Sequence, residues 1–298
     1  MTHLDHIAWG EKPQHSICIP SHKRADCYVF SKLAECEQSA TVYIDEDDDL
    51  NAYSKWGHNV IVGPSQNIAQ KRHSIVTHQL SIGNHFVWFI DDDFYRFHTK
   101  DMDNHVKALT ISELFATAER FIDYEKDMYV KIPAGNLGWF LFGKNKTYKF
   151  KAPSYVSTKT LIAGCYGLNI ELMTKYGINF DPHCPHGVGE DVELVCQFIA
   201  GKHRGRTITI VQADFNRHVK SQAWDFNTEI KEGAHLSYRG IADTSQKHRD
   251  TYIYLKAKYP KLIYWDAKNK LGATTRKQAT EYPDWYEPTF KFGSHVGL

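Results

Sequence analysis

The chain has 298 residues, of which 42% are apolar and 24% charged, and its formal net charge is +1. This composition excludes a disordered chain, and no apolar run approaches the ~20 residues that a transmembrane helix needs. The length and apolar content predict one large domain, or one domain with an elaborated terminal part. The six cysteines have no C-x-x-C spacing, and the first residues lack the basic head and apolar core of a secretory signal, so we expect reduced thiols in a cytoplasmic protein.

Short apolar runs alternate with helical patterns through the first part of the chain. We expect the inner side of the first helix to consist of Tyr28, Val29, Leu33 and Ala34. Strands that alternate with helices are typical of α/β proteins, in which helices flank a mostly parallel sheet. The predicted strands are residues 16–20, 41–44, 59–62 and 86–90, and the predicted helices are residues 24–37 and 67–80.

The middle of the chain begins with a longer helical pattern. Thr110 and Glu113 have the spacing of a capping box, and an apolar stripe follows them, which predicts a helix over residues 110–127. Residues 129–164 lack a helical period, and we expect strands and loops there.

The last third of the chain starts with a helix and is basic. This helix should begin at Gly189 or Glu190 and end at Gly201, because glycine often follows the last helical turn. Residues 1–201 carry 19 Lys and Arg against 25 Asp and Glu, whereas residues 202–298 carry 17 against 10. The resulting charges of −6 and +7 indicate a C-terminal part that could face a polyanion, although chance would give the same pattern.

Polar clusters follow each of the four predicted strands. In open α/β sheets, ligands bind at the carboxyl ends of the strands, where the loops converge and helix N-termini point outward. We therefore expect these clusters to meet at one edge of the sheet. They occupy residues 21–24, 45–49, 63–67 and 91–93.

Three consecutive carboxylates, Asp91, Asp92 and Asp93, end the most apolar of these strands. Such closely packed like charges repel one another, which indicates a positive partner. Because side chains alternate along a strand, Asp91 and Asp93 can share one side and hold a hard divalent cation, with Asp92 on the other side. A solvated acidic turn is the alternative.

Three segments resemble the GT-A-fold nucleotide-sugar glycosyltransferases. FIDDDF, residues 89–94, is similar to their D-x-D motif, and ICIPSHKR, residues 17–24, is similar to their nucleotide-binding first strand. Residues 163–202 resemble their acceptor segment, with a G-x-x-F-D turn before Gly-Glu-Asp at a helix start. The resemblance implies a Rossmann-like, mostly parallel sheet flanked by helices, with a mixed acceptor-side subregion and a helical or irregular C-terminal extension.

The resemblance also implies a division of the chain and a set of binding residues. The core would span residues 1–220, with a nucleotide-sugar half at 16–100, an acceptor half at 101–220 and a basic extension at 221–298. Mn²⁺ or Mg²⁺ would be bound by Asp91, Asp93 and His218, with His235 as the second choice for the histidine. The UDP-sugar donor would contact Pro20, Ser21, Arg24, Asp45, Glu46, Asn67, Lys71, Arg72 and Asp92.

The same resemblance gives roles to Glu190 and Asp191 at the start of a helix. A carboxylate in this position can take the proton of the attacking hydroxyl, and we expect Asp191 to do so if the enzyme inverts the anomeric centre. If the enzyme retains the configuration, Asp191 would instead position the acceptor or the sugar. Without the neighbouring motifs, the pair would also fit an ordinary acidic helix start.

The narrower resemblance is to phage glycosyltransferases associated with TET/JBP-type DNA base modification. It implies a hydroxymethylated pyrimidine, such as 5-hydroxymethylcytosine in double-stranded DNA, as acceptor, and the host cytoplasm as location if the chain is phage-encoded. The basic C-terminal residues, among them Lys256 and Lys258, would contact DNA.

Asp47, Asp48 and Asp49 are expected to cap a short helix.

Other functions fit parts of the sequence. A GT-A transferase with a protein, glycan or small-molecule acceptor would make the basic extension incidental. A nucleotidyltransferase would share the acidic site but should have a glycine-rich first loop, which PSHKR lacks. A DNA-binding or sugar-binding accessory protein could use the carboxylates for a structural cation. The sequence does not indicate which sugar is transferred.

Overall fold

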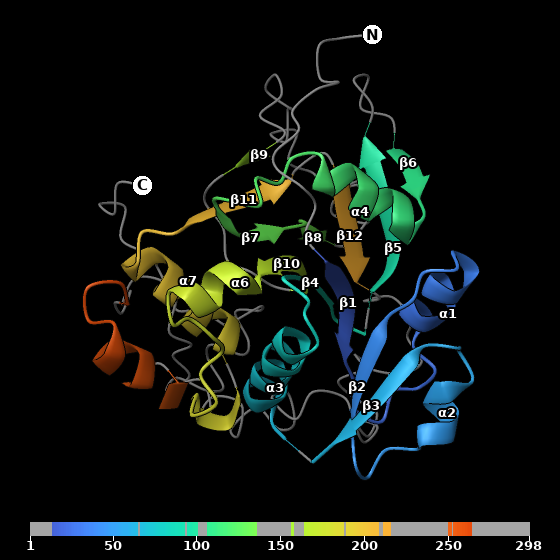
Figure 1. Ribbon diagram of the computed structural model, residues 1–298, viewed down its shortest axis with the longest axis horizontal. Coiled ribbons are helices and arrows are strands. Elements are labelled where there is room, and N and C mark those ends of the chain that lie inside the picture. Colours follow the sequence, from blue (N-terminus) through green and yellow to red (C-terminus); the bar gives the residue numbers. More distant parts are fainter. Residues whose placement is uncertain are drawn as a thin grey trace, which may run out of the picture.

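A mixed sheet of eight strands lies at the centre of the computed structural model (Figure 1), in the order β3-β2-β1-β4-β10-β7-β11-β9. Strands β1 to β4 run parallel to one another, and β11 is parallel to β7, whereas β10 is antiparallel to β4 and β7 and β9 is antiparallel to β11. The strands are β1 His15–Pro20, β2 Thr41–Asp45, β3 Asn59–Gly63, β4 Phe86–Ile90, β7 Asp127–Lys131, β9 Val156–Ser157, β10 Cys165–Asn169 and β11 Arg204–Ile208.

A smaller four-stranded sheet has the order β6-β5-β12-β8. Its strands are β5 Phe94–Lys100, β6 Val106–Leu109, β8 Ala134–Gly135 and β12 Val211–Phe215. The structure describes residues 14–64, 66–92, 94–100, 106–135, 156–157, 164–187, 189–208, 211–215, 250–251 and 253–263. Within these ranges, no helix is long and apolar enough to cross a bilayer.

Helices cover both faces of the main sheet (Figure 1), so β4 is buried on both sides. Alternate β4 side chains enter two cores: Trp88 packs with Phe115 on one face, and Phe89 packs with Phe180 on the other. This two-sided burial explains why the strand is continuously apolar and confirms the predicted α/β class with a mostly parallel sheet. The helices are α1 Tyr28–Glu35, α2 Leu50–Ser54, α3 Ile68–Ser81, α4 Ile111–Glu119, α6 Ile170–Lys175 and α7 Glu190–Ala200.

The first helix is shorter than predicted, and it is rotated. It spans Tyr28–Glu35 rather than residues 24–37, and it buries Val29, Phe30 and Leu33. Tyr28 and Ala34 are exposed, so their predicted place on the inner side is wrong. Phe30 lies on the inner side of the helix instead, and its ring packs edge-on against Tyr53 of α2.

The predicted helix over residues 110–127 begins correctly but ends early. Thr110 and Glu113 form the expected capping box, whereas the helix stops at Glu119. Asp127 instead begins β7, where its buried carboxylate pairs with Arg204 and Arg206 of β11. These ion pairs place Asp127 in a strand beside β11, although the apolar pattern before it is that of a helix.

The described C-terminal residues pack against α7 (Figure 1, orange). Leu255 and Ile263 bury their side chains against Val192 and Cys196 of that helix. Lys258 donates to Asp181 at 2.5 Å and to the buried Glu193 at 2.7 Å. Lys256 and Lys258 therefore have internal partners, because Lys256 donates to backbone carbonyls of the same segment.

Lys258→Met is expected to lower the free energy of unfolding by about 1–2 kcal/mol, because Glu193 would lose its only described cationic partner while keeping the hydrogen bond from Tyr259. The loss is no larger because over a third of the Lys258 side chain is exposed, so water screens the ion pair. Urea denaturation measures the change. Lys261→Met, at an exposed position of the same segment, is the control, and equal stability of the two variants would show that the ion pair contributes nothing.

Candidate active site at the carboxyl ends of the strands

The polar clusters predicted to meet at one edge of the sheet do meet there. Strands β1, β2, β3 and β4 are parallel, so their carboxyl ends lie together. Lys71 of α3 shows the connection: its ammonium donates to the Ser21 carbonyl at 2.8 Å and lies 2.8 Å from Asp45 Oδ1. Helix α3 thus joins the ends of β1 and β2.

Asp92 is buried and held by the loop after β1. Ser21 Oγ donates to Asp92 Oδ2 at 2.7 Å, and Arg24 Nη1 lies 2.5 Å from Asp92 Oδ1. The phenolic oxygen of Tyr53 completes this group, since it lies 2.9 Å from Ser21 Oγ and accepts from the Arg24 backbone N–H. One positive partner of the three consecutive aspartates is therefore an arginine of the chain itself.

Asp91 points toward a second arginine. Arg72 Nη2 donates to Asp91 Oδ1 at 2.6 Å, and Arg72 Nη1 donates to Glu190 Oε1. The guanidinium is buried over the rings of Tyr166 and Phe180. Arg72 thus links α3, the end of β4 and the start of α7, which brings the two halves of the predicted site into direct contact.

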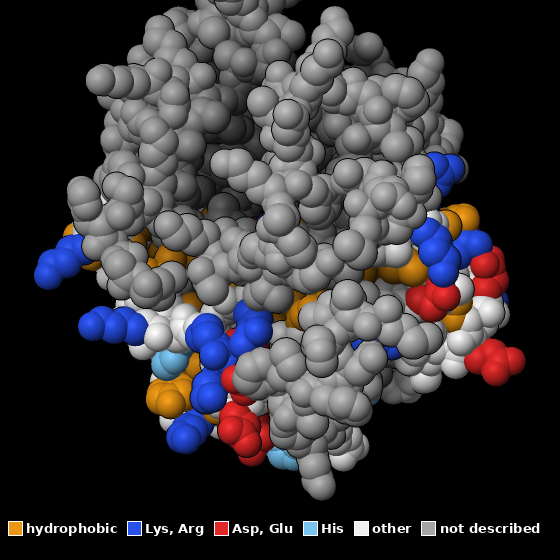
Figure 2. Space-filling view, turned by 90° about the horizontal axis from the view of Figure 1, so that it is seen from above, with side chains coloured by type: hydrophobic (Ala, Val, Ile, Leu, Met, Phe, Trp, Pro, Cys, Tyr) orange, Lys and Arg blue, Asp and Glu red, His pale blue; other side chains and the backbone are white. Residues whose placement is uncertain are grey.

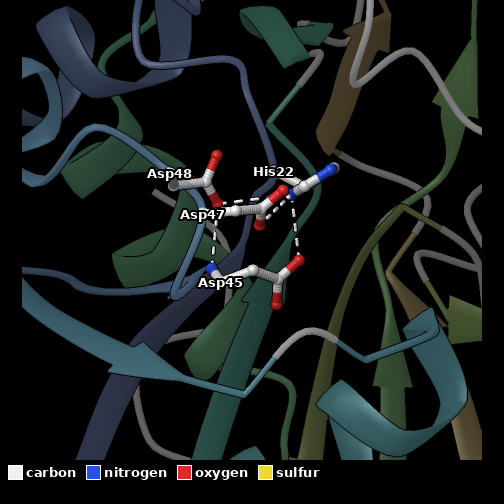
Figure 3. A group of neighbouring side chains, drawn as sticks. All are labelled: His22, Asp45, Asp47 and Asp48. Atoms are coloured by element: carbon white, nitrogen blue, oxygen red, sulfur yellow. Dashed lines mark hydrogen bonds and ion pairs between the residues drawn. The ribbon is translucent and has the colours of Figure 1, made fainter.

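A further polar group lies beside this network, at the end of β2 (Figure 3). His22, Asp45, Asp47 and Asp48 each offer one ligand atom, and these atoms all lie within 4.8 Å of one another. His22 Nδ1 is 2.9 Å from Asp45 Oδ2, and Asp48 accepts from the backbone N–H groups of Lys23 and Asp45. Three carboxylates and an imidazole are suitable ligands for a divalent cation such as Mn²⁺.

Of Asp47, Asp48 and Asp49, which were predicted to cap a short helix, only Asp49 does so. Asp49 is the N-cap of α2 and accepts from the backbone N–H groups of Asn51 and Ala52. Asp48 fixes the loop instead, through the contacts above. Asp47 is half exposed and lies 3.3 Å from Lys23 Nζ.

Helix α7 begins where the sequence predicted, with Gly189 as its N-cap. Gly189 has a φ of 73°, and a Cβ there would approach Thr251 Cγ2 to 2.9 Å, so both conformation and packing require glycine. Burial raises the pKa values of Glu190 and Asp191; Arg72 opposes this effect, and the neighbouring Asp91 adds to it. Burial also lowers the pKa of the nearby Lys131.

The other predicted binding residues take different places. Pro20 is buried at the end of β1, and Glu46 is exposed after β2. Asn67 caps α3 through a capping box with Gln70, which already uses its side-chain oxygen. Asp93, His218 and His235 lie outside the described residues.

Two tyrosines contact the site residues but were not predicted from the sequence. Tyr53 joins Ser21 to Arg24 from α2, and Tyr166 of β10 lies against Arg72. Tyr53 gave no signal, because a tyrosine in a five-residue helix is ordinary. Tyr166 lies two residues after a glycine in the predicted acceptor segment, which was the available indication.

A comparison with protein families matches residues 15–207 to the model of the TET-Associated Glycosyltransferase family. No curated protein matches the sequence.

Three solved structures are similar at low identity. A structure of GalNAc-T7 with UDP, GalNAc and Mn²⁺ has 11% identity and a TM-score of 0.43, and the match covers 68% of this chain and 44% of that one, which is less than half its length. A197 from STIV has 11% identity and a TM-score of 0.38 over 67% and 84% of the two chains. A protein described as a nucleotide-diphospho-sugar transferase from Desulfovibrio desulfuricans G20 has 9% identity and a TM-score of 0.39 over 68% and 82%.

Proposed function

Because the chain belongs to the TET-associated glycosyltransferase family, we propose that it transfers a sugar from a UDP-sugar to the hydroxyl group of a hydroxymethylated pyrimidine in DNA. The observation that carries this proposal is the contact of Arg72 with both Asp91 and Glu190. That contact brings the proposed donor half and acceptor half within the length of one side chain.

The donor nucleotide is proposed to bind between the ends of β1 and β2. Ser21, Arg24 and Asp45 supply hydroxyl, guanidinium and carboxylate groups there. Lys71 contacts the residues at both strand ends, since it bonds the Ser21 carbonyl and pairs with Asp45. Asn67 and Glu46 remain predicted contacts of the donor.

Proton removal is the proposed role of the start of α7. Asp191, with Glu190 beside it, would accept the proton of the attacking hydroxyl in an inverting reaction and would position the acceptor in a retaining one. Their raised pKa values favour this role, because a base is most effective when its pKa is close to the working pH.

A divalent cation, Mn²⁺ or Mg²⁺, is proposed to bind at Asp91, with Asp93 and His218 as further predicted ligands. The Asp91 side chain is 25% exposed, and among the described residues only its Oδ1 has a partner. Such an ion, when bound, supplies positive charge to the leaving diphosphate. The group around His22 is the second place for a cation, although Lys71 and two backbone N–H groups already use part of its oxygens.

The DNA acceptor rests on the family and on the charge of residues 202–298. In the view from above, basic side chains of the described residues form separate groups, and acidic side chains border them both at the lower centre and at the right (Figure 2). Lys256 and Lys258 have internal partners, so we assign the DNA contact to other basic residues of this part of the chain.

Transfer to DNA can be measured directly. The protein is incubated with Mn²⁺, duplex DNA containing 5-hydroxymethylcytosine, and UDP-glucose, UDP-galactose, UDP-N-acetylglucosamine or a UDP-pentose. Mass spectrometry of the digested DNA should detect one added sugar, and EDTA should abolish it. Unmodified DNA is the control. Release of UDP in the presence of Mn²⁺ without modification of the DNA would support a different acceptor, and the absence of both reactions would refute glycosyl transfer.

The pH dependence of transfer should reflect the buried carboxyl groups. An ordinary carboxylate remains deprotonated down to about pH 4. Because burial raises the pKa values of Glu190 and Asp191, protonation should remove the base at a higher pH, and kcat should fall on the acid side well above pH 4. A rate that stays constant down to pH 4.5, with the protein still folded by circular dichroism, would contradict this role.

A further inference from the structure

Two buried polar atoms at the active-site edge have neither a hydrogen-bond partner nor an ion-pair partner among the described residues, whereas Asp45 Oδ1, which also lacks a hydrogen bond, lies 2.8 Å from the Lys71 ammonium. They are the hydroxyl oxygen of Tyr166 and Nε of Arg72, in side chains that are almost completely buried. Arg72 Nε can only donate, and a tyrosine hydroxyl can donate and accept. Because buried polar groups nearly always have partners, two unpaired donors in neighbouring side chains indicate a missing polar atom.

Both atoms lie among the residues proposed to react. The Arg72 guanidinium carbon is 5.7 Å from the centre of the Tyr166 ring. Tyr166 follows Cys165, which pairs with Ile90 at the end of β4, and the Asp91 backbone N–H donates to Gly164 just before β10. Burial raises the pKa of Tyr166 well above its usual value, and Asp91, Glu190 and Asp191 add to this rise, so the hydroxyl keeps its proton.

The start of α7 provides an independent indication. The N-cap of this 11-residue helix is Gly189, which has no side chain to cap it, and in the first turn Asp191 Oδ1 accepts from the Val192 N–H. Arg72, whose guanidinium lies over the Tyr166 ring, donates to both Asp91 and Glu190. Asp91, Glu190 and Asp191 all add to the rise of the Tyr166 pKa, so carboxyl groups as well as donors surround this part of the site.

The chemistry of the missing group follows from these neighbours. An anion would be repelled by the three carboxyl groups, and an apolar group would leave both donors unpaired. A hydroxyl group satisfies both sides, because its oxygen accepts from Tyr166 and Arg72 while its proton is donated to a carboxylate.

We propose that Tyr166 and Arg72 Nε bind a hydroxyl oxygen of a substrate, either of the donor sugar or of the acceptor alcohol. This inference rests on the proposed glycosyl transfer and adds Tyr166 to the residues that contact substrate. A buried water molecule could fill the same position, and the experiment separates the two.

Tyr166→Phe removes only the hydroxyl and keeps the ring that stacks on Phe89 and lies under Arg72. The ligand-free variant should melt at the same or a higher temperature than the wild type, because no described hydrogen bond is lost. Tyr129→Phe, which changes a buried tyrosine that stacks on Phe198 in the same core, is the control and should leave binding and turnover unchanged.

Substrate titrations then identify the source of the hydroxyl. If it belongs to the donor sugar, Tyr166→Phe weakens binding of the UDP-sugar chosen in the transfer assay about tenfold and leaves binding of UDP unchanged. If it belongs to the acceptor, donor binding is unchanged and KM for hydroxymethylated DNA rises about tenfold. The inference is overturned if neither value changes, or if the ligand-free variant melts several degrees lower, as loss of a water-bridged structural hydrogen bond would cause.

Wild-type protein distinguishes failure of this inference from failure of the proposed function. A wild type that neither binds nor turns over any UDP-sugar refutes both. Normal wild-type transfer together with an unaffected Tyr166→Phe variant refutes only the role of Tyr166.

Discussion

Replacing Asp191 with asparagine should lower kcat for sugar transfer by a factor of about 10²–10⁴, the usual contribution of a positioned base. Asparagine keeps the shape of the side chain and the acceptor for the Val192 N–H, which bonds Asp191 Oδ1 at 2.8 Å. The melting temperature should therefore change little. Single-turnover assays at saturating donor and acceptor measure the effect on the chemical step.

Glu171→Gln is the matched control for this substitution. Glu171 is also an acidic residue in the first turn of a helix, but it is exposed on α6. If both variants keep wild-type kcat, Asp191 does not act on the acceptor. If Asp191→Asn binds substrates weakly with unchanged kcat, its role is positioning, as expected of a retaining enzyme.

Replacing Arg72 with methionine should lower the free energy of unfolding by about 3–5 kcal/mol, because two carboxyl groups lose a buried cation. Methionine has a similar length but no charge, so Asp91 and Glu190 would face each other without compensation. Without the cation that opposes the burial effect, the pKa of Glu190 should rise further. The folded protein would then hold the extra proton, so the loss should be largest at high pH and shrink as pH falls through this raised pKa.

Urea unfolding at several pH values tests this result, and Arg120→Met at an exposed position after α4 is the control. The double variant Arg72→Met, Glu190→Gln should recover part of the stability, since it removes one of the unpaired charges. A stability loss independent of pH would attribute the effect to packing against Tyr166 and Phe180 rather than to charge.

The edge of the sheet that carries the site could be predicted because it depends on chain order alone. Alternating strands and helices place the carboxyl ends of parallel strands together, so Ser21, Asp45 and Asp91 were expected to be close to one another before any contact was known. The helix start at Glu190 was predictable for a similar reason, because glycine and acidic residues mark it locally.

The pairing inside the site could not be predicted. Three adjacent aspartates indicated a positive charge, but the sequence could not show that Arg24 and Arg72 provide it, since those partners come from other elements. The predicted pairing of Asp91 with Asp93 is untested by the described residues. Asp92 has different partners from Asp91, but both residues lie after the end of β4, so strand alternation is not the reason.

The same limit explains the errors in helix boundaries. Phe121 and Ile122 continue the apolar pattern of α4 after the helix has ended, because they still pack against the core from a turn. The burial of Asp127 against Arg204 decides where β7 starts, and that contact joins residues 77 positions apart. Local periodicity does not contain such information.

A crystal structure of the protein with UDP and Mn²⁺ tests the central claim most directly. The nucleotide should lie across the carboxyl ends of β1 and β2, with its diphosphate near Asp91 and facing the first turn of α7. A nucleotide bound at another surface, with Ser21, Asp45 and Asp91 contacting no part of it, would contradict the proposed enzyme.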